Sequence, residues 1–327
     1  MKFLLFEWMV GGGLVESESP LDQEDSFFKQ GSAMFSAMAT DLFNAGHHVL
    51  APLDARVQQS GRLPPWAPEH DHFESRIVQG NLQEVLRDLA AESDQIILIA
   101  PESDGILADC YRWLSAFSDH FFGGPLSWIE LASDKNSLQP YLAANGIAVP
   151  SENIAAGCTW IAKPIRGAGS DDVQVFSTAD QKTDFEDRQK WHVEQFVPGK
   201  SVSISIVTVS GRHCFLPPTG QIFGQRASNQ NASLGSLANQ SHSIETCSIG
   251  TYTGAEYPLS DDHARRAIAL ATQTVDVLPE FRGYIGIDMI LADAGPDVVI
   301  EINPRMTMSY CHLPLDLRRR WLEFFGR

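Results

Sequence analysis

The stretch VIEINPRMTMSY, residues 299–310, predicts a β-strand that runs directly into a proline. From Ile300 onward apolar and polar side chains alternate, which is typical of a strand with one apolar and one polar face. Glu301 and Asn303 therefore share a face, and Arg305 follows as soon as Pro304 ends the strand. A carboxylate and a carboxamide side by side indicate either a solvated sheet face or a binding site.

A second strand, GYIGIDMILA at residues 283–292, precedes this one, and the turn signal DAGP separates them. The turn is centred between Ala294 and Gly295, so the hairpin places Asp288 opposite Glu301, with Asn303 on the same face. The other face collects the apolar side chains of Ile287, Met289, Ile300 and Ile302.

Directly opposed residues on paired strands lie about 5 Å apart, and like charges at that distance destabilise the pair. Asp288 opposite Glu301 is tolerable if a cation lies between them. Carboxylate and amide oxygens are ligands that suit Mg²⁺ bridged to substrate phosphates, with Mn²⁺ as the alternative ion. The hairpin therefore predicts a metal site at Asp288, Glu301 and Asn303. A polar face with chance acids remains the alternative.

The segment WIAKPIRGAGSDDVQVF, residues 160–176, predicts a strand that presents Lys163, a glycine-rich turn and a second strand. Gly167, Gly169 and Ser170 lie in that turn. Glycines let backbone N–H groups approach phosphate oxygens closely, and Lys163 adds a positive charge. The segment therefore favours a phosphate-binding loop, although a plain hairpin turn would have the same composition.

Two further segments are weaker candidates. The link Glu194-Gln-Phe196-Val197 joins two apolar strands, and such a link can offer backbone groups to a purine edge or be a simple loop. Lys135 begins a short helix that Ser133 or Asp134 would cap.

The first third of the chain alternates strands and helices, which predicts a small parallel α/β domain. Its first strand ends in Gly11-Gly12-Gly13, a loop that is either a substrate wall with free backbone N–H groups or a tight turn. The domain is expected to end near FFGGPLSW, residues 121–128, and residues 224–243 form a polar, aperiodic segment that is either a lid or disordered.

The formal net charge of −17 would repel a nucleic-acid backbone, so the sequence argues against nucleic acid as a partner. Five scattered cysteines without a CxxC pair favour reduced thiols in a cytoplasmic protein. Glu7 interrupts the first apolar run too early for a signal peptide, and no stretch reaches membrane-spanning length. No motif sets the oligomeric state, and a homodimer is left open.

The order of these segments resembles the ATP-grasp superfamily over roughly residues 127–310, with GIDMI followed by EINPR as the most specific part. The resemblance implies an α/β N-terminal domain followed by an α+β ATP-grasp fold. The expected division is a pre-ATP-grasp domain at residues 1–125, one subdomain at 126–195, and a second subdomain with the metal site at 196–327.

The resemblance also implies a role for each motif. Residues matching Asp288, Glu301 and Asn303 hold Mg²⁺ in this superfamily. ATP phosphates contact the positions of Lys135, Lys163 and the glycine-rich loop, and the segment from Glu194 to Val197 faces adenine. Many members have an acid shortly afterwards for the ribose, whereas this chain has Lys200 or Ser201, which puts the ribose contact in doubt.

Within the superfamily, FEWMVGGG at residues 6–13 and EINPRMTMSY at 301–310 look most like the tyramine–glutamate ligase group of cofactor biosynthesis. This similarity implies that a small-molecule carboxylate and an amine are the substrates. The carboxylate would be phosphorylated and the amine would attack the acyl phosphate, with Arg305 and Lys163 as the catalytic cations. Tyr252, near Gly254, is a candidate for a lid that excludes water.

Two other functions stay open at this level. An ATP-grasp kinase would phosphorylate a hydroxyl, and a nucleotide-binding protein without turnover would need no substrate at all. The histidines at 70 and 72 are expected on a solvated surface, since no further ligand is near them in sequence.

Overall fold

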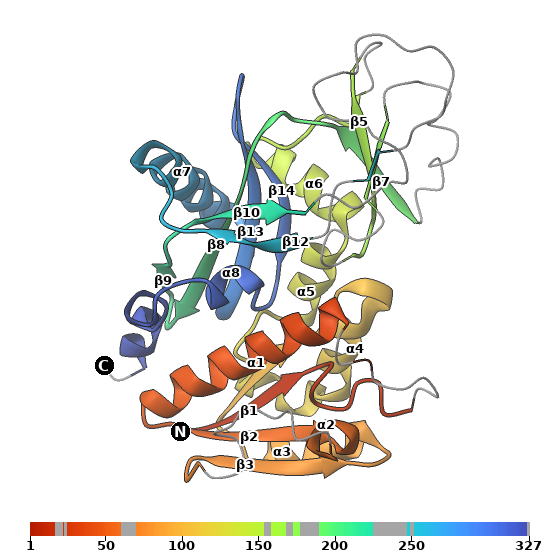
Figure 1. Ribbon diagram of the computed structural model, residues 1–327, viewed down its shortest axis with the longest axis vertical. Coiled ribbons are helices and arrows are strands. Elements are labelled where there is room, and N and C mark those ends of the chain that lie inside the picture. The colour runs from red at the N-terminus through yellow and green to blue at the C-terminus, as the bar shows by residue number, and fades with distance from the viewer. Residues whose placement is uncertain are drawn as a thin grey trace.

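The computed structural model describes residues 1–16, 22, 25–59, 70–153, 158–167, 173–176, 190–224, 247–248 and 252–325. Its strands form three sheets: one lies at each end of the molecule's long axis and the third lies between them (Figure 1). The expected order, an α/β N-terminal domain followed by an α+β region, is confirmed. No helix within the described residues has the length and the apolar run that crossing a bilayer requires.

The N-terminal sheet is fully parallel and has the strand order β3-β2-β1-β4. Its strands are β1 (Lys2–Glu7), β2 (His48–Asp54), β3 (Phe73–Val78) and β4 (Gln95–Ile99). Parallel sheets are covered on both faces, so their strands are almost continuously apolar. In β1, Phe3 and Leu5 belong to the core beneath one layer of helix, while Leu4 and Phe6 belong to the core beneath the other.

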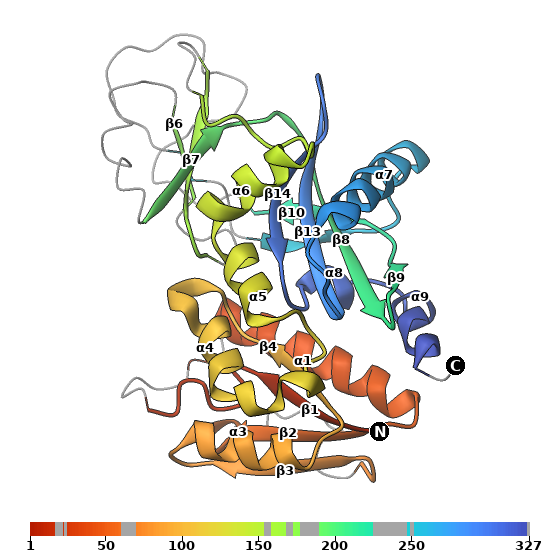
Figure 2. The ribbon, with the colours of Figure 1, turned by 180° about the vertical axis from the view of Figure 1, so that it is seen from behind.

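Helix α1 (Ser26–Asn44) covers one face of this sheet, and α3 (Leu82–Ala91) and α4 (Ile106–Trp113) cover the other (Figure 2). Asp25 caps α1 by accepting the N–H of Phe27 at 2.7 Å, and the helix ends just before Gly46, whose φ is +78°. The remaining short helices are α2 (Ala55–Gln59) and the 3₁₀ turns Ser103–Gly105 and Ser115–His120.

Strand β3 was not predicted from the sequence. Its residues FESRIV include the exposed Glu74 and Ser75, and the strand lies at the edge of the sheet. An edge strand buries little, so its sequence carries a weak apolar pattern. Helix α5 (Leu126–Ser133) was also missed, whereas the next helix, α6 (Lys135–Ala144), was expected.

The small sheet at the opposite end is antiparallel, with the order β11-β6-β5-β7. It contains β5 (Trp160–Pro164), β6 (Gln174–Phe176), β7 (Trp191–Gln195) and β11 (Cys247–Ser248). Helices α5 and α6 connect the N-terminal domain to this sheet (Figure 2).

The central sheet has the order β12-β10-β8-β13-β14, with β9 paired to β8. Its strands are β8 (Gly199–Val209), β9 (Arg212–Phe215), β10 (Thr219–Phe223), β12 (Tyr252–Glu256), β13 (Gly283–Ala292) and β14 (Val298–Asn303). Helix α7 (Asp261–Val277) packs on β8 and β13. Three short helical segments follow β14: α8 (Met308–Cys311), α9 (Leu315–Arg318) and the 3₁₀ turn Arg320–Phe324.

The C-terminal segment is held against α1 by one buried carboxylate. Asp41 is fully buried and accepts hydrogen bonds from the Tyr310 hydroxyl at 2.8 Å, Arg318 Nε at 2.6 Å and Arg319 Nε at 2.7 Å. Through these bonds the N-terminal domain is fixed to the segment that follows the central sheet.

Replacing Asp41 with Asn should therefore destabilise the protein by about 3 kcal/mol, because the buried Arg318 loses its counter-charge. Urea unfolding of Asp41→Asn measures this loss. Glu92→Gln is the matched control: its pair with Arg76 is exposed and should contribute less than about 1 kcal/mol. Equal effects of the two substitutions would contradict the anchoring role of Asp41.

Candidate active site

The hairpin of β13 and β14 has the register expected from its turn. Asp288 pairs with Glu301, and Gly286 pairs with Asn303. The prediction that Asp288 and Glu301 face each other is confirmed. Asp288 also pairs with Ser203 of β8 on its other side, so the carboxylate lies in the middle of the sheet.

One detail of this hairpin differs from the sequence expectation. The register shifts after Asp288, so that Met289 pairs with Val299 and the strand carries a β-bulge. Val299 is consequently the residue buried in the core, while Ile300, expected on the apolar face, is only half-buried. The carbonyl of Ile300 accepts a hydrogen bond from Gln139 Nε2 of α6 at 2.9 Å, which stabilises the irregular backbone from a distant helix.

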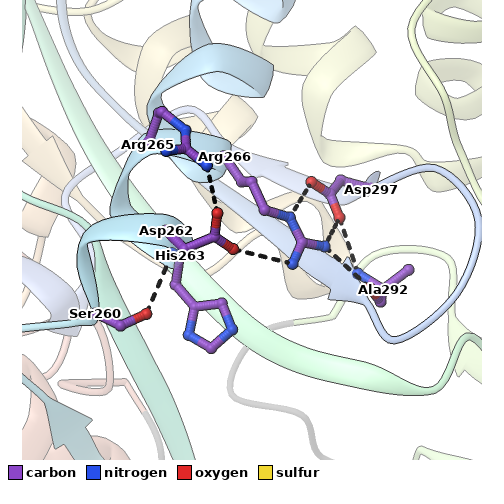
Figure 3. A network of polar contacts seen from close by, with 7 residues as sticks. All are labelled: Ser260, Asp262, His263, Arg265, Arg266, Ala292 and Asp297. Carbon is purple, nitrogen blue, oxygen red and sulfur yellow. Dashed lines mark hydrogen bonds and ion pairs between the residues drawn. The ribbon is translucent and has the colours of Figure 1, made fainter.

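The turn end of the hairpin is fixed to helix α7 (Figure 3). Arg266 of α7 donates from Nε to Asp297 at 3.0 Å and from Nη2 to the carbonyl of Ala292 at 2.9 Å. Asp297 in turn accepts the N–H of Ala292 at 2.9 Å. Because Ala292 ends β13 and Asp297 precedes β14, these contacts hold the turn that sets the register.

The electrostatics of the hairpin favour a cation. Burial, and then the neighbouring charge of Glu301, raise the pKa of Asp288 to about 6. Hydrogen bonds from Ser203, Gln221 and Asn303 act in the opposite direction and lower this pKa, but by less. Asp288 Oδ1 is buried without a hydrogen-bond partner. Asn303 Nδ2 donates to Asp288 Oδ2 at 3.3 Å, which leaves the amide oxygen for another partner.

Lys135 lies beside these carboxylates, with Nζ at 3.5 Å from Glu301 Oε1. It begins α6, and Asp134, not Ser133, caps that helix by accepting the N–H of Ser137 at 3.1 Å. No group of three His, Cys, Asp or Glu side chains is arranged for a metal in the described residues. The metal-compatible set consists instead of two carboxylates and one amide, which is the donor chemistry of Mg²⁺.

Lys163 lies in a separate ion-paired cluster on the small sheet. Its ammonium is 2.5 Å from Glu194 Oε1, and His192 Nε2 is 3.0 Å from Glu194 Oε2. Burial opposes ionisation of Glu194, but Lys163 and His192 outweigh it and lower its pKa. Glu194 is thus engaged with the lysine expected at the phosphates, and His192 is a member of the cluster that the sequence did not suggest.

The remaining nucleotide candidates lie in the link between β7 and β8, at the start of β8 in the central sheet, and in the glycine-rich turn. Phe196 is 37% exposed and Val197 half-buried in the link between β7 and β8. Ser201 donates to Gln221 Oε1 at 2.5 Å, and Lys200 pairs with Glu256 at 2.6 Å. Gly167 closes the described part of the glycine-rich turn, whereas Gly169, Ser170 and the segment from 225 to 243 lie outside the described residues.

A cavity of about 540 Å³ opens beside the hairpin, between the N-terminal domain and the central sheet. One side is made by Asp288, Glu301, Asn303 and Arg305, and the other by residues of the loop after β1 and of α1. Tyr252 of β12 also lines the cavity; its hydroxyl lacks a hydrogen-bond partner, and burial raises its pKa.

The glycines expected to form a substrate wall do not line this cavity. The N–H groups of Gly11 and Gly13 donate to the carbonyls of Glu7 and Trp8 at 2.7 and 2.8 Å, so they are used within the loop. Gly12 has a φ of +93°, which the turn requires. Of the two interpretations of Gly11–Gly13, the structure favours the tight turn, which presents Glu7 and Trp8 to the cavity, over a substrate wall.

Arg305 reaches the cavity while paired with the N-terminal domain. Its Nη2 donates to Glu102 Oε2 at 2.7 Å; the Glu102 side chain is buried, and that of Arg305 is 10% exposed. Burial opposes its charge, but Glu102 foremost, with Glu301 and Asp288, raises the pKa of Arg305. Sequence reasoning missed Glu102, which follows β4 and lies 203 positions from Arg305. The sequence did contain one signal for Glu102: it is a carboxylate shortly after a buried parallel strand.

The raised pKa of Asp288 predicts the sign of a stability effect. Above about pH 6 the buried ionised carboxylate destabilises the metal-free fold, and this cost disappears once the pH falls below the ordinary value of 3.8. Asp288→Asn should therefore stabilise the metal-free protein at pH 8, by up to about 3 kcal/mol, and the gain should shrink as the pH falls through 6.

Urea unfolding at several pH values tests this expectation. Asp297→Asn on the same hairpin is the control, and it should destabilise the protein by about 1 kcal/mol or more since Arg266 loses its partner. A loss of stability in Asp288→Asn as large as that in Asp297→Asn would show that Asp288 is a structural acid.

Two family models match the chain: an ATP-grasp domain over residues 132–309 and a pre ATP-grasp 3 domain over residues 53–127. No curated protein sequence matches it. Among solved structures, a protein from Archaeoglobus fulgidus assigned to the ATP-grasp superfamily is 20% identical, with a TM-score of 0.64, over 95% of this chain and 83% of the other.

Two ligases are similar in fold. The D-alanine–D-alanine ligase from Bacillus anthracis is 16% identical, with a TM-score of 0.57, over 99% of this chain and 94% of its own. The L-amino acid ligase from Bacillus licheniformis is also 16% identical, with a TM-score of 0.55, over 93% of this chain and 66% of its own.

Proposed function

The chain belongs to the ATP-grasp family, and from that membership we propose that it is an ATP-dependent ligase that joins a carboxylate to an amine through an acyl phosphate. The observation that carries the proposal is the convergence of Asp288, Glu301 and Asn303 with Arg305 at one cavity. The cofactors are ATP and Mg²⁺, with Mn²⁺ as the alternative ion.

The metal would be held by Asp288, Glu301 and Asn303, whose oxygens include the unpartnered Asp288 Oδ1. When bound, Mg²⁺ supplies charge neutralisation to the phosphates of ATP. Two lysines would also neutralise the charge of the phosphates. Lys135, next to Glu301, and Lys163, next to Glu194, are both buried and oriented by these acids toward phosphate contacts.

Arg305 is positioned to act at the reacting carboxylate. Its guanidinium is fixed by Glu102 on one side and faces the cavity with the metal-binding acids on the other. Fixed cations in a water-poor site stabilise developing charge more effectively than mobile ones. We assign Arg305 to the acyl-phosphate oxygens and the link Glu194–Val197 to adenine.

The substrates follow from the resemblance together with the cavity. A site with apolar walls and several carboxylates suits an amine better than a second anion. Glutamate as the acid and tyramine or a related aromatic amine as the nucleophile are the pair we propose, in line with the tyramine–glutamate ligase group. Tyr252 then helps to keep water away from the acyl phosphate.

Phosphate release from ATP tests this function. The ligase should release phosphate, with Mg²⁺, only when an acid and an amine are both present, and mass spectrometry should detect their amide. Asp288→Asn and Glu301→Gln should each lower turnover at least about 100-fold, because both remove a proposed metal ligand. Glu84→Gln is the matched control, since Glu84 is exposed on α3.

Full turnover in both hairpin variants would exclude the metal site. Phosphate transfer to an alcohol without any amine would instead identify a kinase.

A further inference from the structure

Glu7, the last residue of β1, is a buried carboxylate that the proposed mechanism has not used. It is 3% exposed and lines the cavity. Its Oε2 accepts the N–H of Val10 at 2.8 Å, which fixes the orientation of the carboxylate. Helix α1 accommodates it through Gly31, where a Cβ would lie 2.3 Å from Glu7 Oε1. The fold therefore leaves space for a charged group at the wall of the cavity.

The surroundings of Glu7 supply little positive charge. In the described part of the chain, Arg305 is the cation that acts on Glu7, and that guanidinium is already paired with Glu102 at 2.7 Å. Near α1, Asp22 and Asp25 also line the cavity, and the Asp25 carboxylate accepts the N–H of Phe27 as the helix cap. A buried carboxylate without a counter-ion is costly unless a ligand brings the missing charge.

The walls around Glu7 are apolar. Trp8, Met9 and Leu14 come from the loop after β1, and Phe27 and Met34 come from α1. Phe27 is 37% exposed, so part of its ring is open to solvent. An apolar chamber with the buried carboxylate of Glu7 at its wall is complementary to a ligand that has an apolar body and a cationic end.

We propose that Glu7 and this apolar chamber form the subsite for the amine substrate, with the ammonium held by the Glu7 carboxylate and the apolar body packed against Trp8 and Met34. This inference rests on the proposed ligase function and specifies its nucleophile: a primary ammonium attached to an apolar group. Glu7 is also the residue that accepts the first proton of that ammonium.

The proton transfers balance. Glu7 takes one proton and leaves a neutral amine, whose nitrogen forms the C–N bond as the C–O bond of the acyl phosphate breaks. The second proton leaves with the phosphate, and Glu7 returns its own proton to solvent. Burial raises the pKa of Glu7 to about 7, because its effect exceeds the lowering by backbone hydrogen bonds and by Arg305. Glu7 can therefore accept a proton near neutral pH.

Calorimetry with phenethylamine as the probe, and 2-phenylethanol as its uncharged counterpart, tests the subsite directly. The wild-type protein should bind the amine at least about tenfold more tightly than the alcohol. Amine affinity should rise up to about tenfold between about pH 6 and about pH 8, as Glu7 becomes ionised. Equal binding of the two probes by the wild-type protein would overturn the proposal without any variant.

Glu7→Gln should weaken phenethylamine binding at least about tenfold and remove its pH dependence, while 2-phenylethanol binding stays unchanged. Glu84→Gln, which removes an exposed carboxylate elsewhere, should leave both probes unaffected. If Glu7→Gln binds the amine as tightly as the wild-type protein, Glu7 is not the ammonium site.

Trapping with hydroxylamine separates this inference from the ligase proposal. Hydroxylamine is small and largely uncharged at neutral pH, so it can intercept an acyl phosphate without the subsite. With L-glutamate as the acid, both wild type and Glu7→Gln should form hydroxamate from ATP, but only the wild type should use phenethylamine efficiently. Absence of hydroxamate with every amino acid tried would contradict the ligase proposal, whereas the amine-binding result would still be valid.

Discussion

Asp288 and Glu301 face each other across a buried hairpin, and the sheet around them prevents the two carboxylates from separating. Their repulsion contributes to the raised pKa of Asp288, and the buried Asp288 Oδ1 has no partner. Folding alone would favour an apolar or a paired residue at that position. A divalent cation between the two carboxylates would offset their negative charge. The proposed role of every other residue at the site depends on this pair of acids.

The rest of the molecule holds this pair in place and adds to it. Arg266 and Asp297 fix the turn end of the hairpin, and Gln139 supports the bulge at Ile300. The N-terminal domain supplies Glu102, which orients Arg305, and Glu7, which faces the same cavity. Asp41 keeps the C-terminal segment against α1. The site is thus assembled between the N-terminal domain and the central sheet, and neither part contains it alone.

The sequence predicted those features of the site that depend on residues close together in the chain. The DAGP turn and strand alternation predicted the pairing of Asp288 with Glu301. The bulge escaped prediction because strand alternation carries no sign of it, and the hydrogen bond that supports it comes from Gln139, 161 positions away from Ile300. Glu102 and Glu7 escaped for the same reason: their roles arise from contacts with Arg305 and Gly31 that only the tertiary structure creates. The edge strand β3 had too little apolar surface to be recognised.

The most direct test of the central claim is anomalous diffraction from crystals grown with Mn²⁺ and a non-hydrolysable ATP analogue. The account predicts a manganese peak within about 2.0–2.3 Å of carboxylate oxygens of Asp288 and Glu301, with the Asn303 amide oxygen and the phosphates completing the shell. A manganese ion bound by the nucleotide alone, with Asp288 and Glu301 making no contact to it, would contradict the account.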